Sequence, residues 1–168
     1  GTADWVPEDG ISAHPKLDEK TGELLFFNYS IKPPFLHYGV VGPDDQIAHF
    51  IPVPLPGPRL PHDMAFSEHY AIFNDCPMFG ILPRRGQPED IQWFDARPTY
   101  VLHWANAFEE GDELVLDGYF QNQPVPPPLT DSPAGYESMG ASIDLHSFQP
   151  ELHRWRFNLK TGETREET

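Results

Sequence analysis

Proline and glycine interrupt this chain so often that short elements bounded by turns are favoured over long helices. The 168 residues contain 20 prolines and 13 glycines, and many segments between them are rich in aromatic and β-branched residues, which favour strands. Apart from one helical turn expected after Pro88, few segments have a helical period. The sequence therefore predicts an all-β protein, with strands over residues 23–30, 35–41, 46–53, 64–73, 91–94, 100–106, 113–120 and 152–159.

Turns that contain glycine indicate a repeated organisation. The tetrapeptide Lys-Thr-Gly-Glu occurs at residues 20–23 and again at 160–163, and each copy places glycine where a tight turn needs a positive φ. Residues 110–112 predict a third such turn. The two copies are 140 positions apart (20 to 160), or three steps of about 47 residues, and a propeller blade takes about 40–50. This spacing agrees with a propeller, and we see no internal boundary within the single domain 1–168.

The charge of the chain limits the classes of partner. The formal net charge is −15 at pH 7, which argues against nucleic acid, because phosphate binding needs clustered lysine and arginine. The same charge disfavours an anionic membrane surface or a polyanionic substrate. A neutral, apolar or aromatic small molecule is compatible with it, although acidic charge on a small domain most often serves solubility.

Cysteine content and hydropathy bear on location. The single cysteine, Cys76, excludes an internal disulfide and suits a reducing compartment. No apolar run of about 18 residues is present, and no basic-then-apolar leader opens the chain. We therefore expect a cytoplasmic protein without a transmembrane segment, which leaves peripheral membrane contact open. Because the chain starts without Met and stops in a charged segment, we expect it to be part of a longer protein.

Three of the eight histidines have a spacing that suggests a shared site. His14, His62 and His103 are 48 and 41 positions apart (14 to 62 and 62 to 103), close to one propeller blade each. Equivalent positions on successive blades face the same axis, so these imidazoles are candidates to converge. The other histidines are expected to have structural roles; they are His37, His49, His69, His146 and His153.

The residues next to these histidines support a metal site but do not identify the metal. Pro15 biases His14 towards extended backbone, and Pro61 has its own φ fixed just before His62. His103 is expected within an apolar strand, where an unpaired imidazole would be costly. Three neutral imidazoles suit zinc, copper, iron or nickel, so a hydrolytic zinc site is an open alternative at this point.

The segments around these histidines resemble those of the carotenoid cleavage oxygenases and their lignostilbene-cleaving relatives. Residues 13–18 (AHPKLD) with 21–24 (TGEL) resemble the first iron-histidine segment of that family. Residues 54–59 (PLPGPR) leading into His62 and Asp63 resemble the second, and 102–103 with 106–112 (NAFEEGD) resemble the third. The intervening run 79–84 (FGILPR) and the tail 152–157 (LHRWRF) are similar as well. The resemblance extends over nearly the whole chain from residue 12.

This resemblance implies a seven-bladed β-propeller, of which 168 residues would supply about three to four blades. It also implies an Fe(2+) ion held on the axis by four histidines, with His14, His62 and His103 matching the first three. The reaction implied is the cleavage of a carbon–carbon double bond in a carotenoid, apocarotenoid or stilbenoid by O2, which gives two carbonyl products. An apolar polyene or stilbene is therefore the expected substrate, and the side chains expected near it are Leu102, Trp104, Phe66 and Phe79.

Four departures from the family pattern shape a second hypothesis. The segment that carries the fourth histidine is absent, and so are the glutamates that usually orient the ligands. The stretch between Cys76 and Phe79 is shorter than usual, and Leu102 stands where many relatives have Phe. We therefore expect weak iron binding and little activity from this chain alone, and the alternative to a dioxygenase is a catalytically inactive propeller fragment or binding module.

Overall fold

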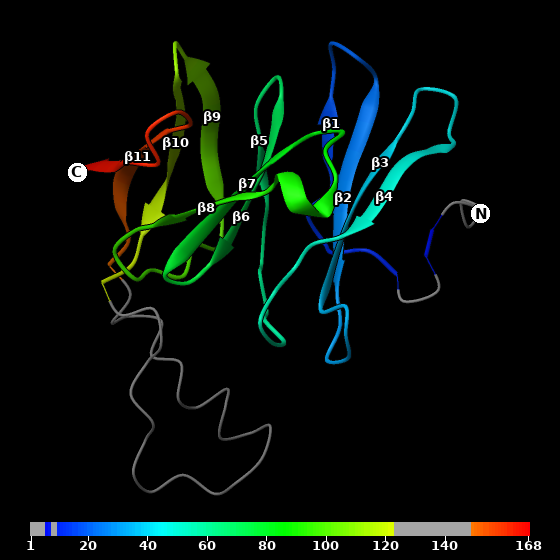
Figure 1. The fold of residues 1–168 in the computed structure, drawn as a ribbon, viewed down its shortest axis with the longest axis horizontal. Helices are drawn as coiled ribbons and strands as arrows, with labels where there is room; N and C mark the ends of the chain where they lie inside the picture. The colour runs from blue at the N-terminus through cyan, green and yellow to red at the C-terminus, as the bar shows by residue number, and fades with distance from the viewer. Residues whose placement is uncertain (1–5, 8–9, 123–148) are drawn as a thin grey trace, which may run out of the picture.

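The computed structural model describes residues 6–7, 10–122 and 149–168, and this part of the chain is almost entirely β-structure (Figure 1). Its strands form three four-stranded antiparallel sheets, and strands that are adjacent in sequence are adjacent in each sheet. The first sheet contains β1 (Lys16–Asp18), β2 (Glu23–Tyr29), β3 (Leu36–Val41) and β4 (Ile47–Pro52). The prediction of an all-β protein is confirmed.

The other two sheets repeat this arrangement. The second contains β5 (Ala65–Phe66), β6 (Tyr70–Asp75), β7 (Met78–Pro83) and β8 (Gln92–Asp95), with the expected helical turn as η1 (Pro88–Asp90). The third contains β9 (Trp104–Glu110), β10 (Glu113–Phe120), β11 (Glu151–Asn158) and β12 (Thr164–Glu167). The second sheet lies between the other two in Figure 1, so the described residues form three consecutive blades.

The predicted glycine turns are confirmed. Gly22 (φ 71°) lies between β1 and β2, Gly111 (φ 64°) between β9 and β10, and Gly162 (φ 76°) between β11 and β12. In both copies of the repeated tetrapeptide the turn is closed in the same way. The Gly22 N–H donates to the Asp18 carbonyl at 2.8 Å, and the Gly162 N–H donates to the Asn158 carbonyl at 2.9 Å.

Two apolar layers hold the blades together. Between the first and second sheets the layer includes Phe27, Tyr38 and Phe73, and between the second and third it includes Phe79 and Trp155. Each of these side chains is almost fully buried. Face-to-face burial of this kind supplies most of the stability of a sheet packed on a sheet.

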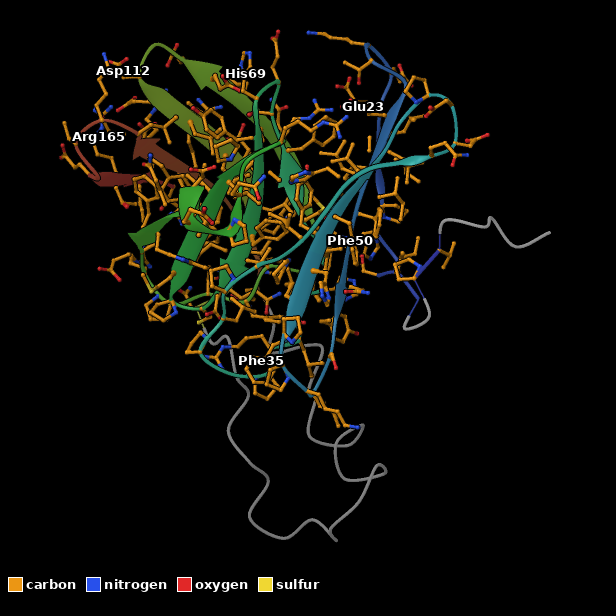
Figure 2. All side chains as sticks on the ribbon, turned by 45° about the vertical axis from the view of Figure 1, so that its right-hand side comes forward. Glu23, Phe35, Phe50, His69, Asp112 and Arg165 are labelled. Carbon is orange, nitrogen blue, oxygen red and sulfur yellow. The ribbon has the colours of Figure 1, made fainter. Side chains whose placement is uncertain are left out.

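The first strands of the three sheets, β1, β5 and β9, line a common groove, which we call the axial groove. Glu23, His69 and Asp112 follow these three strands, and all three lie at the upper edge of the molecule in Figure 2. The three first strands therefore run in the same direction, and the residues that precede them lie at their other end.

Several strand boundaries differ from the predictions. The run 64–73 is two strands, β5 and β6, separated by the turn at residues 67–69, and β7 was not predicted, nor were β1 and β12. Residues 100–103 are not in a strand, because the register of β9 against β10 is irregular at Asp117 and Gly118 and the pairing ends at Trp104. The sequence also predicts a proline-rich loop over residues 122–135, which lies outside the described residues from 123 onward.

Candidate metal centre

Three imidazoles from three different blades lie together at the starts of the first strands. His14, His62 and His103 come shortly before β1, β5 and β9 respectively. The ring centroids are 4.7 Å apart for His14 and His62, 4.9 Å for His14 and His103, and 5.2 Å for His62 and His103. The structure therefore brings together the three histidines that the spacing had singled out.

The separation of one pair of donor atoms fits a shared metal ion, and the third donor atom lies close to both. Imidazole nitrogen binds zinc at about 2.0–2.1 Å, so two ligands at right angles around an ion of that size are about 3.0 Å apart. His14 Nε2 and His62 Nε2 are 3.0 Å apart, and one donor atom from each of the three residues lies within 4.8 Å of the others. Ligation itself stays a prediction.

The electrostatics at His62 favour its neutral, metal-binding form. Burial lowers the pKa of His62, and the charges that His14 and His103 would carry lower it further. A histidine with a lowered pKa is neutral near pH 7, and the neutral ring is the form that binds a metal.

The environment of His103 differs from the expectation. Its side chain is 57% exposed, and it lies in the irregular segment before β9. The expectation of a buried imidazole within an apolar strand is therefore wrong, because strand pairing reaches only as far as Trp104. The ring still contacts the other two histidines with its edge.

The remaining described histidines have other partners, and for His49 this is the Tyr38 ring. His37 Nδ1 lies 3.2 Å from the side-chain oxygen of Asn28, and its ring stacks on Phe50. His69 Nδ1 lies 2.7 Å from a Glu109 carboxylate oxygen. His153 is buried and lies 3.0 Å from a Glu166 carboxylate oxygen. Among the described residues, His14, His62 and His103 form the one group of potential ligands close enough to share a metal ion. His146 lies outside the described residues.

The four residues expected near substrate fall into two groups. A groove with a volume of about 580 Å³ runs along β1, β5 and β9, and it is lined by Phe66 and Trp104. Phe79 is instead fully buried between Trp104, Trp155 and Phe157. Leu102 is 42% exposed and does not line this groove. A role in substrate binding remains a prediction for all four, with Phe66 and Trp104 the better placed.

One charged pair beside the histidines was not foreseen. Asp63 is buried, and Lys16 Nζ lies 2.7 Å from its Oδ1 atom. The sequence offered only a weak signal, namely that charged residues follow His14 and His62 within two positions.

The part of the chain that the structure describes contains no helix with the length and hydropathy of a membrane span.

Comparison with known proteins identifies the family. The profile described as retinal pigment epithelial membrane protein matches residues 1–79 and 77–168. Carotenoid 9,10(9′,10′)-cleavage dioxygenase 1 of Phaseolus vulgaris is 32% identical over 180 residues, and that of Arabidopsis thaliana 34% over 177; these alignments cover 91% and 90% of this chain. Isoeugenol monooxygenase of Pseudomonas putida is 29% identical over 177 residues, or 90% of this chain.

The chain spans about a third of the length of these relatives, since the alignments cover 31%, 31% and 36% of them. Among solved structures, the lignostilbene dioxygenase of Pseudomonas brassicacearum aligns with a TM-score of 0.75 and 24% identity, covering 94% of this chain and 38% of the other. The cobalt-substituted oxygenase of Synechocystis aligns with a TM-score of 0.71 and 21% identity, covering 95% and 39%. At these identities the likeness establishes the fold, a part of a β-propeller. With a family profile along its whole length, the chain belongs to the retinal pigment epithelial membrane protein family, which is that of the carotenoid cleavage oxygenases.

Proposed function

We propose that this chain supplies three histidine ligands, His14, His62 and His103, to the Fe(2+) centre of a dioxygenase that cleaves a carbon–carbon double bond with O2. The observation that carries the proposal is the convergence of these imidazoles from three separate blades, with donor atoms within 4.8 Å of one another. Relatives named for carotenoid cleavage support the type of reaction. Iron with open coordination positions would supply the activation of O2.

The proposed substrate is an apolar polyene or stilbenoid. Phe66 and Trp104 present aromatic surface in the axial groove, where burial of a conjugated hydrocarbon would be favourable. The net charge of −15 disfavours anionic substrates. The protein contributes by orienting the substrate and by limiting water around it. The proposed location is the cytoplasm, where the exposed, unpaired Cys76 would stay reduced.

Metal analysis of the purified chain tests the ligand assignment. We expect binding of Fe(2+) to the wild-type chain, weaker than that of an enzyme with four histidine ligands, and loss of this binding in His62→Ala. His37→Ala is the matched control, because His37 lies against Asn28 and away from the group, and it should bind as the wild type does. Equal binding by wild type and His62→Ala would contradict the proposal.

Product analysis tests the reaction. The iron-loaded chain would be incubated in air with a carotenoid, an apocarotenoid and a stilbene, and O2 uptake and carbonyl products would be measured. We expect low turnover that depends on iron and on His62. Turnover that is retained with zinc in place of iron would contradict an oxygenase.

A further inference from the structure

We propose that Asp63 is a positioning residue that sets the relative placement of the three histidines. The inference rests on the proposed metal centre and deepens it. Asp63 follows His62 directly in the sequence, and its side chain is only 2% exposed. A buried carboxylate is costly unless charged or N–H groups compensate it. The partners of Asp63 therefore show which segments of the chain it connects.

The partners of Asp63 come from all three segments that carry the histidines. Lys16 Nζ, two residues after His14, lies 2.7 Å from Oδ1. The Met64 N–H donates to the same oxygen at 2.8 Å. The Trp104 N–H, directly after His103, donates to Oδ2 at 3.4 Å, which is a long hydrogen bond. One carboxylate therefore connects the starts of β1, β5 and β9.

This connection matters most for His103. Its segment is irregular, its side chain is largely exposed, and the pairing of β9 with β10 ends at Trp104. The bond from the Trp104 N–H to Asp63 thus adds an anchor to the backbone at the point where the sheet pairing ends. His103 Nδ1 also lies 3.9 Å from Asp63 Oδ2, too far for a hydrogen bond but on the side that faces the carboxylate.

Other carboxylates between blades connect fewer segments. Glu109, on β9, accepts hydrogen bonds from the Ser67 hydroxyl at 2.6 Å and the His69 N–H at 2.9 Å. It therefore ties the second blade to the third, as Asp63 does, but near the far end of β9 from His103. Glu109→Gln is consequently a matched control, since it weakens a contact between the same two blades away from the histidines.

The test is a titration with Co(2+), followed by visible absorption, of the wild type and of Asp63→Asn and Glu109→Gln. Asn keeps the size of the side chain and one acceptor oxygen but removes the charge that pairs with Lys16. Replacing a residue that orients a metal ligand typically lowers the metal affinity by about 10–100-fold. We expect a loss of that size and an altered cobalt spectrum in Asp63→Asn, and wild-type affinity and spectrum in Glu109→Gln.

Each outcome decides the question. Wild-type affinity and spectrum in Asp63→Asn would overturn the inference while leaving the proposed centre intact, and an equal loss in Glu109→Gln would overturn it as general loosening of the blades. No cobalt binding by the wild type would overturn both proposals. If circular dichroism shows Asp63→Asn to be unfolded, Lys16→Met decides in its place, with weaker cobalt binding expected and unchanged binding contradicting the inference.

Discussion

At the scale of single residues, the surroundings of Trp104 depend on a glycine that serves packing. A Cβ atom on Gly118 would lie 2.7 Å and 2.9 Å from two ring carbons of Trp104. That ring is already in contact with Phe79 and Trp155. Trp104 also borders the axial groove and directly follows His103. A side chain at position 118 that displaced Trp104 would therefore also alter the groove and the segment that carries His103.

Gly118→Ala should therefore destabilise the fold. Forcing an extra methyl group into a packed contact costs about 1–3 kcal/mol, and urea denaturation would measure the free energy of unfolding. Gly57→Ala is the control, because its new Cβ would meet only Arg59 Nη1 at 3.5 Å, an ordinary contact. A change of the same size in both variants would contradict the packing argument.

The candidate site was predictable from the sequence at some of these positions and not at others. Blade-length spacing was sufficient to group His14, His62 and His103. Exposure of His103 was not predictable, because it follows from a register irregularity at Asp117 and Gly118 in the pairing of β9 with β10, which no sequence pattern marks. The partners of Asp63 were hidden for a different reason: Lys16 and Trp104 lie in other blades, far from Asp63 in the sequence.

At the scale of elements, the turn between β5 and β6 is tied to β9 by an ion pair that depends on pH. His69 Nδ1 lies 2.7 Å from a Glu109 oxygen, and this hydrogen bond raises the pKa of His69. A raised pKa means that the folded state favours protonated His69. Its stabilisation is complete below the ordinary histidine pKa of about 6.5 and is lost as the pH rises through the higher folded value.

The melting temperature of the wild type should accordingly exceed that of His69→Gln at pH 5.5, with a difference that shrinks towards pH 9. Because the His69 side chain is 67% exposed, the difference should be small and should fall further in high salt. Thermal denaturation by circular dichroism at several pH values would measure it. A difference that grows with pH would contradict the assignment.

The elements that sequence patterns failed to predict have physical causes too. In β7, Gly80 resembles a turn residue, yet a Cβ there would lie 2.8 Å from Ile91 Cδ1 and from the Trp93 ring. Gly80 therefore leaves room for the Ile91 and Trp93 side chains to pack on β7, and it does not mark the end of a strand. β1 and β5 have only three and two residues, too few for an alternating pattern to be recognised.

At the scale of the whole molecule, Arg84 joins the first two blades. It is buried and bonds Asp18 at 2.7 Å and Glu23 at 2.6 Å. The hydrogen bond from Arg84 lowers the pKa of Asp18, with further lowering from the Lys20 N–H and the Thr21 hydroxyl, against the opposing effect of burial. A lowered pKa means that the folded state favours the ionised carboxylate.

Asp18→Asn should lower the stability at pH 7 by about 1–3 kcal/mol, the cost of removing one of the two carboxylates that compensate the buried Arg84. The stabilisation from ionised Asp18 is complete above its ordinary pKa of about 3.9 and is lost as the pH falls through the lower folded value. The gap between wild type and variant should therefore close as the pH falls below about 4. Chemical denaturation from pH 7 to pH 2 would measure it, and a constant gap would contradict the assignment.

The distribution of the histidines over three sheets has a consequence for the order of folding. No two of them belong to the same blade, so local folding of any one blade creates at most a single donor. A multidentate site arises only after all three blades have docked, which requires contacts between residues more than 40 positions apart and is a late, slow event for chains rich in distant contacts. Uptake of a metal ion by this chain would thus report completed assembly of the blades, and a refolding experiment could use cobalt absorbance as the signal for that final step.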